Sequence, residues 1–309
     1  MPRPAMLFVR YFPGLLGGGL KVFDYIGHVA ASQRFEPVLH LRPGSADPAR
    51  YLPASVRLVD RPVPADAYFL AGADWRFLDE AGIDTRERPV INLIQGFRHL
   101  RPGDRNHEFL SRPALRICVS EALATALHAS GRANGPVVAV PNGLDLVALE
   151  PLRCEASERV FIAGLKHVAL ARVVAERLLD AGVDVDCCVE RVSRDEFLAR
   201  IAACAVTVAL PFDFEGFYLP ALEAMALGSA VVIPHAPGPA TYCVDGETAM
   251  VTSYEADELA ASALRVLNDR TLRFALRAAG RRVAHEHSLE RERAAFHALL
   301  ERHLPEFVA

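Results

Sequence analysis

Short apolar runs bounded by turn residues recur along the first half of the chain and predict buried strands. These strands are expected at Met6–Tyr11, Pro37–His40, Val56–Val59, Ala67–Leu70, Val90–Ile94, Leu115–Val119 and Val137–Val140. After the first of them, Leu20, Phe23, Ile26 and Val29 stand at three-residue steps, which predicts a helix over residues 20–32.

The second half of the chain repeats this plan. Strands are predicted at Val160–Ala163, Val183–Val189, Val206–Leu210 and Ala230–Ile233, and helices at Val168–Ala181, Ser193–Ala203, Asp257–Asn268, Thr271–Glu286 and Leu289–Glu301. Ser193 is placed to cap its helix, with Glu196 in the reciprocal position of a capping box. Alternating strands and helices predict an α/β fold, in which mostly parallel sheets are covered by helices on both faces.

Length and composition point to a two-domain globular protein. The chain has 309 residues, and single cores stop growing near about 250–300 residues. We expect a hinge near Leu146–Glu158, with a first domain over residues 1–150, a second over 151–285 and a terminal helical segment over 286–309. The net charge of −4 provides no basic footprint for nucleic acid, so no nucleic-acid partner is expected.

The cysteines and the hydropathy of the chain indicate in which cellular compartment the protein is expected. The six cysteines, at positions 118, 154, 187, 188, 204 and 243, form no Cys-x-x-Cys pair, which predicts reduced thiols and a cytoplasmic protein. The longest uncharged stretch, Ala224–Val244, is interrupted by glycine and proline, so it does not predict a membrane-spanning helix. Peripheral contact with the inner face of a membrane stays open.

The segment from Glu215 to Gly228 carries most of the functional signal. It reads Glu-Gly-Phe-Tyr-Leu-Pro-Ala-Leu-Glu-Ala-Met-Ala-Leu-Gly. Pro220 suits the first position of a helix and Gly228 its carboxyl-terminal cap, so Glu215 precedes the helix and Glu223 lies in its first turns. The N–H groups of residues 217–219 would form an anion site. Although each glutamate alone has an ordinary structural explanation, the whole arrangement indicates a pocket for a sugar nucleotide.

This segment resembles the Glu-(seven residues)-Glu signature of retaining glycosyltransferases of family 4, the glycosyl transferases group 1, which have the GT-B fold. The likeness continues at Ser229–Val232, at Val244–Val251 (Val-Asp-Gly-Glu-Thr-Ala-Met-Val) and at Pro141–Asp145 (Pro-Asn-Gly-Leu-Asp). It extends from about residue 115 to residue 285 and is weak before that.

The resemblance implies a fold and an activity. The fold would consist of two Rossmann-like, doubly wound parallel-sheet domains that face a central cleft, with the terminal helix crossing back to the first domain. The first domain would receive a glycan, lipid-linked or small-molecule acceptor, and the second a nucleotide-diphosphate sugar. The enzyme would retain the anomeric configuration, use no metal and need no cofactor besides the donor co-substrate. Together with a short chain that has many alanines and arginines, the resemblance suggests a bacterial enzyme of polysaccharide biosynthesis.

The resemblance also assigns roles to residues. Glu215 would contact the donor sugar, Lys166 the diphosphate and His99 the sugar, and these three are the catalytic candidates. The donor-binding candidates are Glu223 at the ribose diol, with Gly216, Phe217, Tyr218, Leu219, Val192, Gly18 and Gly19.

Plainer explanations of these candidates stay open. The loop of Lys166 is short and lacks the arginine usual in the family, so Lys166 is either a phosphate ligand or a solvated side chain. The glycines at 17–19 are either a phosphate-facing loop or a simple turn between a strand and a helix. His99 and Val192 are equally explained as ordinary loop residues. Asp184 and Asp186 fall within a strand pattern, which favours a structural role over a metal site.

Two alternative functions stay open as well. One is another GT-B chemistry, such as that of an epimerase or a phosphorylase. The other is a catalytically inactive GT-B domain that binds a sugar, a nucleotide or a partner, because the first domain is short and matches the family poorly.

Overall fold

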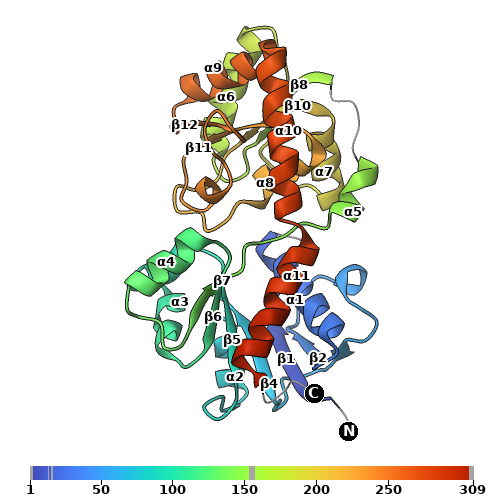
Figure 1. Cartoon of the computed structure of the whole chain (residues 1–309), viewed down its shortest axis with the longest axis vertical. Helices are drawn as coiled ribbons and strands as arrows, with labels where there is room; N and C mark the ends of the chain where they lie inside the picture. The colour runs from blue at the N-terminus through green and yellow to red at the C-terminus, as the bar shows by residue number, and fades with distance from the viewer. Residues whose placement is uncertain (1–2, 13, 15–16, 153–156, 306–309) are drawn as a thin grey trace. The chain divides into compact units, whose positions relative to one another are not determined.

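The computed structural model describes residues 3–12, 14, 17–152 and 157–305 and divides into two compact units (Figure 1). The first unit combines the residues up to Asn142 with those from Glu290 onward, and the second runs from Gly143 to Leu289. Each unit is built on one sheet whose neighbouring strands pair in parallel.

The first sheet has the strand order β3-β2-β1-β4-β5-β6-β7. Its strands are β1 (Ala5–Arg10), β2 (Glu36–Leu41), β3 (Arg57–Leu58), β4 (Ala67–Ala71), β5 (Val90–Ile94), β6 (Leu115–Cys118) and β7 (Val137–Ala139). The helices of this unit are α1 (Gly17–Ser32), α2 (Trp75–Glu80), α3 (Arg105–Glu108), α4 (Glu121–Ala129) and α11 (Leu289–His303), with short 3-10 turns η1 (Ala49–Tyr51), η2 (Phe97–Leu100) and η3 (Phe109–Ser111). The chain builds outward from β1 through β2 and β3 and then returns to β4, so the switch point of this sheet lies between β1 and β4.

The second sheet has the order β12-β11-β10-β8-β9. Its strands are β8 (Ser157–Ala163), β9 (Asp184–Cys188), β10 (Cys204–Ala209), β11 (Ala230–Pro234) and β12 (Met250–Thr252). The helices are α5 (Leu146–Leu149), α6 (Val168–Asp180), α7 (Arg194–Ala202), α8 (Leu219–Leu227), α9 (Ala256–Asn268) and α10 (Arg270–Glu286), with 3-10 turns η4 (Glu150–Leu152) and η5 (Pro239–Thr241). Here the switch point lies between β8 and β10.

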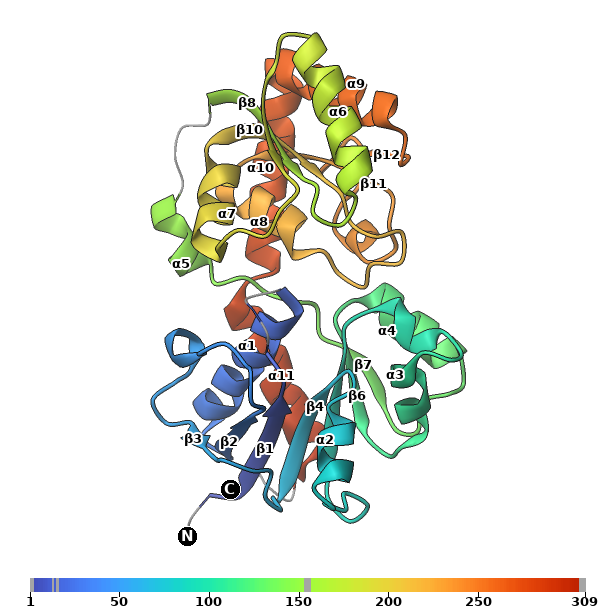
Figure 2. The same cartoon turned by 180° about the vertical axis from the view of Figure 1, so that it is seen from behind.

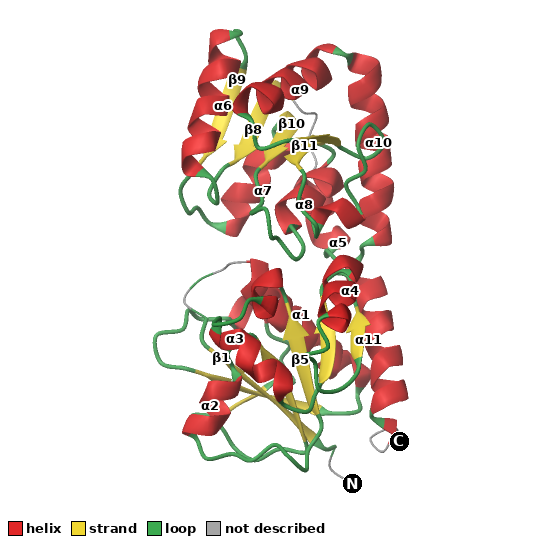
Figure 3. Ribbon diagram, turned by 90° about the vertical axis from the view of Figure 1, so that its left-hand side faces the viewer, coloured by secondary structure: helices red, strands yellow, loops and turns green. Residues whose placement is uncertain are grey.

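Helices cover both faces of each sheet. In the first unit α1 and α11 lie on one face (Figure 1), and α2 lies on the other (Figure 2). Because alternate side chains of a strand point to opposite faces, Leu7 packs in the core beside Trp75, while Phe8 stacks on Phe69 at 4.9 Å under α1 and α11. In the second unit α6 and α9 cover one face and α7 and α8 the other (Figure 3). These layers are those of a doubly wound α/β protein.

The structure corrects the predicted glycine loop. Gly17, Gly18 and Gly19 form the first turn of α1, which begins three residues before the predicted start at Leu20. The reason is close packing, since a Cβ at Gly19 would lie 2.2 Å from the Phe12 ring. Only glycine lets the start of this helix approach the end of the first strand so closely.

The structure also moves the predicted domain boundary. The chain enters the second unit at Gly143, ahead of the expected hinge at Leu146–Glu158, of which residues 153–156 lie outside the described part. Leu144 donates its N–H to the carbonyl of His287 at 2.9 Å, and Leu289 donates to the carbonyl of Leu144 at 2.8 Å. These two bonds tie the incoming and outgoing chain together at the edge of the second unit.

A buried charge cluster joins α11 to α1 in the first unit. The ammonium of Lys21 lies 2.5 Å from Glu292 Oε2 and 2.7 Å from Asp24 Oδ2, and His28 Nε2 lies 3.7 Å from the same glutamate oxygen. Burial alone would raise the pKa of Glu292, but the charge of Lys21 holds it below its usual value. Burial lowers the pKa of His28, which keeps that ring neutral at physiological pH.

Other features of the described residues concern thiols, metals and membranes. Cys118, Cys187, Cys188, Cys204 and Cys243 are free thiols, and Cys154 lies outside the described part. The described side chains include no group of three or more His, Cys, Asp or Glu that could hold a metal ion. Within the same residues, no helix has the length and apolar character needed to cross a membrane.

Candidate functional site

Two loops meet at the switch point of the second sheet. β8 ends at Ala163 and is followed by Gly164 and Lys166, while β10 ends at Ala209 and its loop runs on to Glu215 before α8. In open parallel sheets, residues that follow the carboxyl ends of the strands at the switch point line the ligand site. Topology therefore selects the same loops as the sequence motif does.

Lys166 and Glu215 form an ion pair at this point, with Nζ in contact with Oε2. The ammonium also lies 4.9 Å from the centre of the Tyr218 ring and 5.2 Å from that of Phe212, within the range of a cation–π interaction. The two side chains are 31% and 17% exposed, respectively. Lys166 is thus held in place while remaining accessible to a ligand, and it is not a freely solvated side chain.

Glycines fix both loops. A Cβ at Gly164 would lie 2.3 Å from the Cβ of Ala171, so the loop after β8 packs directly on α6. A Cβ at Gly238 would lie 2.3 Å from the carbonyl carbon of Gly216, and the N–H of Gly238 donates to the carbonyl of Glu215 at 3.0 Å. The loop after β11 therefore sets the position of the Glu215 backbone.

The helix of the motif begins one residue before the predicted position. Leu219 is its first residue, so Pro220 occupies the second position, and Tyr218 is the cap residue whose carbonyl accepts the N–H of Ala221 at 3.2 Å. Proline is tolerated there because first-turn N–H groups have no partner within the helix. Gly228 ends the helix with a φ of 85°, as predicted for a left-handed cap.

Tyr218 links the parts of this site. Its hydroxyl donates to the carbonyl of Ala163 at 3.4 Å, and its own carbonyl accepts the hydroxyl of Tyr242 at 2.6 Å. Burial, and after it the charges of Glu215 and Glu223, raise the pKa of Tyr218 far above its usual value. The phenol is therefore neutral, and both carboxylates of the motif act on it.

Glu223 is buried and paired. Its side chain is 2% exposed, and its Oε1 lies 2.7 Å from Nη1 of Arg194. Arg194 is the first residue of α7, where the hydroxyl of Ser193 accepts the N–H of Glu196 at 3.2 Å, as the capping prediction required. The cap of α7 thereby places a half-exposed guanidinium against the carboxylate that was assigned to the ribose.

The remaining donor candidates of the second unit lie around these groups. Gly216 is buried beneath Gly238, and the Phe217 ring packs 5.0 Å from that of Tyr242. Leu219 is half-buried at the start of α8, and Val192 is half-buried in the loop between β9 and α7. All of them follow the carboxyl ends of strands of the second sheet.

Three candidates belong to the first unit. His99 is 3% exposed in η2, and burial, followed by the charge of Arg98, lowers its pKa to about 4. It is therefore a neutral ring at physiological pH rather than a loop side chain in solvent. Gly18 accepts the side-chain amide of Gln95 at 2.8 Å through its carbonyl, and Gly19 packs under Phe12.

The sequence prediction missed three residues that shape these sites. Arg194 pairs with Glu223, Gly238 fixes Glu215, and Arg10 ends the first strand beside Asp74. Each had a weak local signal. Arg194 follows a capping serine, Gly238 stands between two prolines, and Arg10 is a charged residue at the carboxyl end of an apolar strand.

Solved structures share this fold over almost the whole chain. A sucrose-phosphate synthase from Thermosynechococcus elongatus has a TM-score of 0.74 at 14% identity, with 98% of this chain and 100% of that chain covered. Anabaena HepE in complex with UDP-glucose has a TM-score of 0.74 at 15% identity, covering 97% and 100%. WaaG, a glycosyltransferase involved in lipopolysaccharide biosynthesis, has a TM-score of 0.62 at 14% identity, covering 95% and 99%. The chain has the GT-B fold of glycosyltransferases.

Sequence comparison finds similarity to glycosyltransferases within the second unit. Residues 162–283 match the model of the family described as Glycosyl transferases group 1, so this part of the chain is similar to that family. An MMP alpha-(1->4)-mannosyltransferase from Mycolicibacterium hassiacum is 44% identical over 81 residues, which are 24% of this chain. The chain spans only 18% of the length of that relative in this match.

Proposed function

We propose that the protein is a retaining glycosyltransferase of family 4 that transfers a sugar from a nucleotide-diphosphate sugar to a glycan, lipid-linked or small-molecule acceptor. The observation that carries the proposal is the Lys166–Glu215 pair at the switch point of the second sheet, directly before the start of α8. The family match over residues 162–283 and the UDP-glucose complex of HepE support a nucleotide-sugar donor.

The leaving diphosphate would be stabilised by two groups. Lys166 supplies an ammonium, and the start of α8 supplies first-turn N–H groups with partial positive charge. An ammonium has three N–H donors, so Lys166 can keep Glu215 while it reaches a phosphate oxygen. Groups fixed before the reaction stabilise the charge that develops on the departing diphosphate without reorganising.

The two glutamates would hold the donor sugar and its ribose. Glu215 would accept hydrogen bonds from hydroxyls of the transferred sugar, and Glu223 from the ribose diol. Each hydrogen bond to a charged group contributes about 1.5–3 kcal/mol. We assign neither residue as a nucleophile. His99 would act as a neutral hydrogen-bonding group, because its lowered pKa leaves no proton for imidazolium acid catalysis near pH 7.

The setting of the reaction is also part of the proposal. The donor would need no metal and no further cofactor, and Gly18 and Gly19 would contact substrate from the first unit. We infer a cytoplasmic bacterial enzyme of polysaccharide biosynthesis that can contact a membrane peripherally. The lipopolysaccharide role of the fold relative WaaG supports this setting.

A nucleotide screen tests the donor site. Thermal shift with UDP, GDP, ADP and TDP should reveal at least one binder, and a ligand at 100 times its Kd adds about 2.7 kcal/mol of apparent stability. Lys166→Met should weaken the shift strongly. Arg177→Met is the matched control, because that arginine pairs with Asp257 on the exposed surface of the same unit.

Turnover decides between an enzyme and a binding protein. With a binding nucleotide known, its sugar donors are assayed for transfer, and the anomeric configuration of the product is read by NMR. A product with the donor configuration supports retention, and inversion contradicts it. If the protein binds a nucleotide but transfers no sugar from any donor to any acceptor, the inactive GT-B alternative is favoured.

A further inference from the structure

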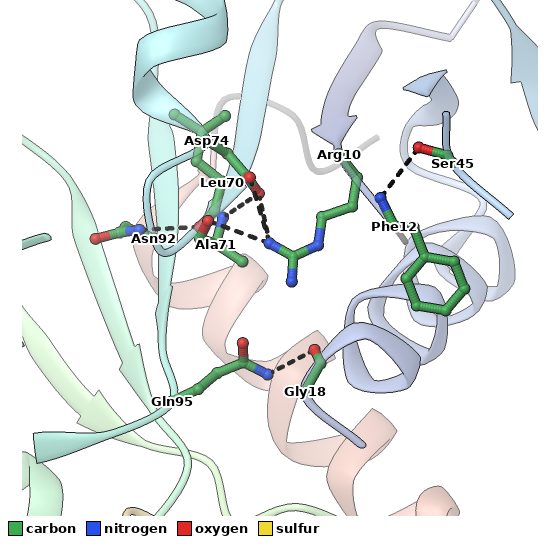
Figure 4. A network of polar contacts seen from close by, with 9 residues as sticks. All are labelled: Arg10, Phe12, Gly18, Ser45, Leu70, Ala71, Asp74, Asn92 and Gln95. Carbon is green, nitrogen blue, oxygen red and sulfur yellow. Dashed lines mark hydrogen bonds and ion pairs between the residues drawn. The ribbon is translucent and has the colours of Figure 1, made fainter. Parts of the chain in front are cut away.

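The first unit has its own ion pair at its own switch point. Arg10 is the last residue of β1, and Asp74 lies in the turn after β4. Nη1 of Arg10 lies 3.2 Å from Oδ2 and 3.3 Å from Oδ1 of Asp74 (Figure 4). The pair occupies the place in the first sheet that Lys166 and Glu215 occupy in the second.

The turn after β4 holds Asp74 in position. Its Oδ2 accepts the N–H of Ala71 at 3.0 Å, and Arg10 Nη1 also reaches the carbonyl of Ala71 at 3.5 Å. The carboxylate is 6% exposed, whereas the side chain of Arg10 is 19% exposed. Asp74 therefore serves as a fixed counter-ion behind a guanidinium that stays partly open.

Two polar groups of this region are free to meet a ligand. Among the described residues, none accepts a hydrogen bond from Nη2 of Arg10. Gln95, directly after β5, donates its Nε2–H to the carbonyl of Gly18 at 2.8 Å, which leaves its Oε1 as an acceptor. Figure 4 shows the guanidinium of Arg10 and the amide of Gln95 facing the same space. We call Arg10, Asp74, Gln95 and Gly18 the Arg10 cluster.

Charge indicates which ligand the Arg10 cluster suits. Asp74 already neutralises Arg10, so a phosphate or carboxylate placed at Nη2 would also feel the repulsion of a buried carboxylate close by. Two neighbouring hydroxyl groups of a sugar carry no charge, so Asp74 does not repel them. One hydroxyl oxygen can accept from Nη2, and its neighbour can donate to Oε1 of Gln95.

We propose that the Arg10 cluster binds vicinal hydroxyls of an uncharged sugar, and that this sugar is the acceptor. Arg10 and Gln95 make the contacts, and Asp74 is a positioning residue that fixes Arg10 and cancels its charge. The assignment as acceptor rests on the proposed function, whereas the binding of a neutral sugar does not.

Saturation-transfer NMR at pH 7.5 tests this site with methyl α-D-mannopyranoside and methyl α-D-glucopyranoside as neutral probes. Mannose 6-phosphate and glucose 6-phosphate are the charged comparison. The neutral glycosides should give signals that fall at least fivefold in Arg10→Met and in Gln95→Leu. The control Arg57→Met, which removes an exposed partner of Glu36 in the same unit, should leave the signals unchanged.

The Gln95→Leu variant keeps the ion pair intact, so it tests the site even where Arg10→Met fails to fold. Wild-type protein that binds neither glycoside overturns the proposal, and so do variants that bind like wild type. A stronger signal from the phosphorylated sugars that disappears in Arg10→Met would establish an anion site instead and would also overturn it. Nucleotide shifts are measured on the same samples. Glycoside binding without any nucleotide binding would refute the glycosyltransferase function but leave the sugar site standing.

Discussion

Arg194 Nη1 lies 2.7 Å from Oε1 of Glu223, and the two side chains come from the first residue of α7 and the middle of α8. The carboxylate assigned to the ribose therefore has a protein counter-ion. This pairing gives a carboxylate that is only 2% exposed an oppositely charged group inside the second unit. A change at Arg194 should therefore affect any ligand that Glu223 binds.

Removing Arg194 is expected to weaken nucleotide binding. Arg194→Met leaves a buried carboxylate without its counter-ion, so Glu223 loses the group that fixes its orientation. A double-mutant cycle of Arg194→Met and Glu223→Gln, followed by thermal shift with the binding nucleotide, should give a coupling of about 0.5–3 kcal/mol. Additive effects, or full nucleotide affinity in Arg194→Met, would refute the link.

A methyl group at position 238 is expected to disturb the donor site. The Cβ of Gly238→Ala would meet the backbone of Gly216 at 2.3 Å and the carbonyl oxygen of Glu215 at 2.5 Å, so the loop carrying Glu215 must move. Misplacement by about 1 Å can cost about 100-fold in rate. The measurement is kcat for sugar transfer. Gly27→Ala is the control, since nothing lies within 4 Å of its added Cβ, and equal rates in both variants would contradict the prediction.

The buried cluster between α1 and α11 is expected to be costly to break. Lys21→Met leaves Glu292 buried beside Asp24 without its cation and should destabilise the first unit by about 3–5 kcal/mol. Adding Glu292→Gln should restore part of that loss. Hydrogen exchange of α11 amides reports on this unit separately. Arg34→Met, which removes an exposed pair with Glu301, should change stability by about 1 kcal/mol or less.

Acid is expected to destabilise the protein through His99. The pKa of His99 is about 4 in the folded chain, against an unfolded value of 6.5, so the unfolded state takes up a proton that the folded state refuses. The contribution of neutral His99 to the free energy of unfolding is therefore fully present above pH 6.5 and is lost as the pH falls toward 4. At pH 5 the loss is about 2 kcal/mol. Denaturant unfolding of wild type and His99→Gln at pH 7.5 and pH 5 measures this. Identical losses in both proteins would show that His99 is not responsible.

Local patterns in the chain were sufficient to predict the alternating strands and helices and the α/β fold class. Buried strands such as β1 and β10 carry continuous apolar runs, and α8 has proline near its start and glycine at its end. These signals lie within a few neighbouring residues, so they can be recognised without knowledge of the tertiary structure. For the same reason the Glu215–Glu223 segment could be placed on a loop and a helix.

Features that depend on distant contacts could not be predicted in this way. The start of α1 depends on the Phe12 ring against Gly19, and the start of the second unit depends on Leu144 meeting His287. The pairing of Arg194 with Glu223 requires α7 to pack beside α8. Sequence alone gives the residue types in each case, but it does not give the partner.

The split of the first unit has a consequence for synthesis. Its sheet is made from residues before Gly143, but α11, which carries Phe296 and Glu292 into its interior, is translated after the whole second unit. Domains generally fold as units while the chain emerges from the ribosome. The continuous segment from Gly143 to Leu289 can therefore fold first. Until α11 is made, Tyr25 of α1 and Phe69 of β4, whose rings pack against Phe296, remain uncovered. Chaperones that recognise apolar surface can bind the nascent chain during the time between synthesis of this sheet and synthesis of α11.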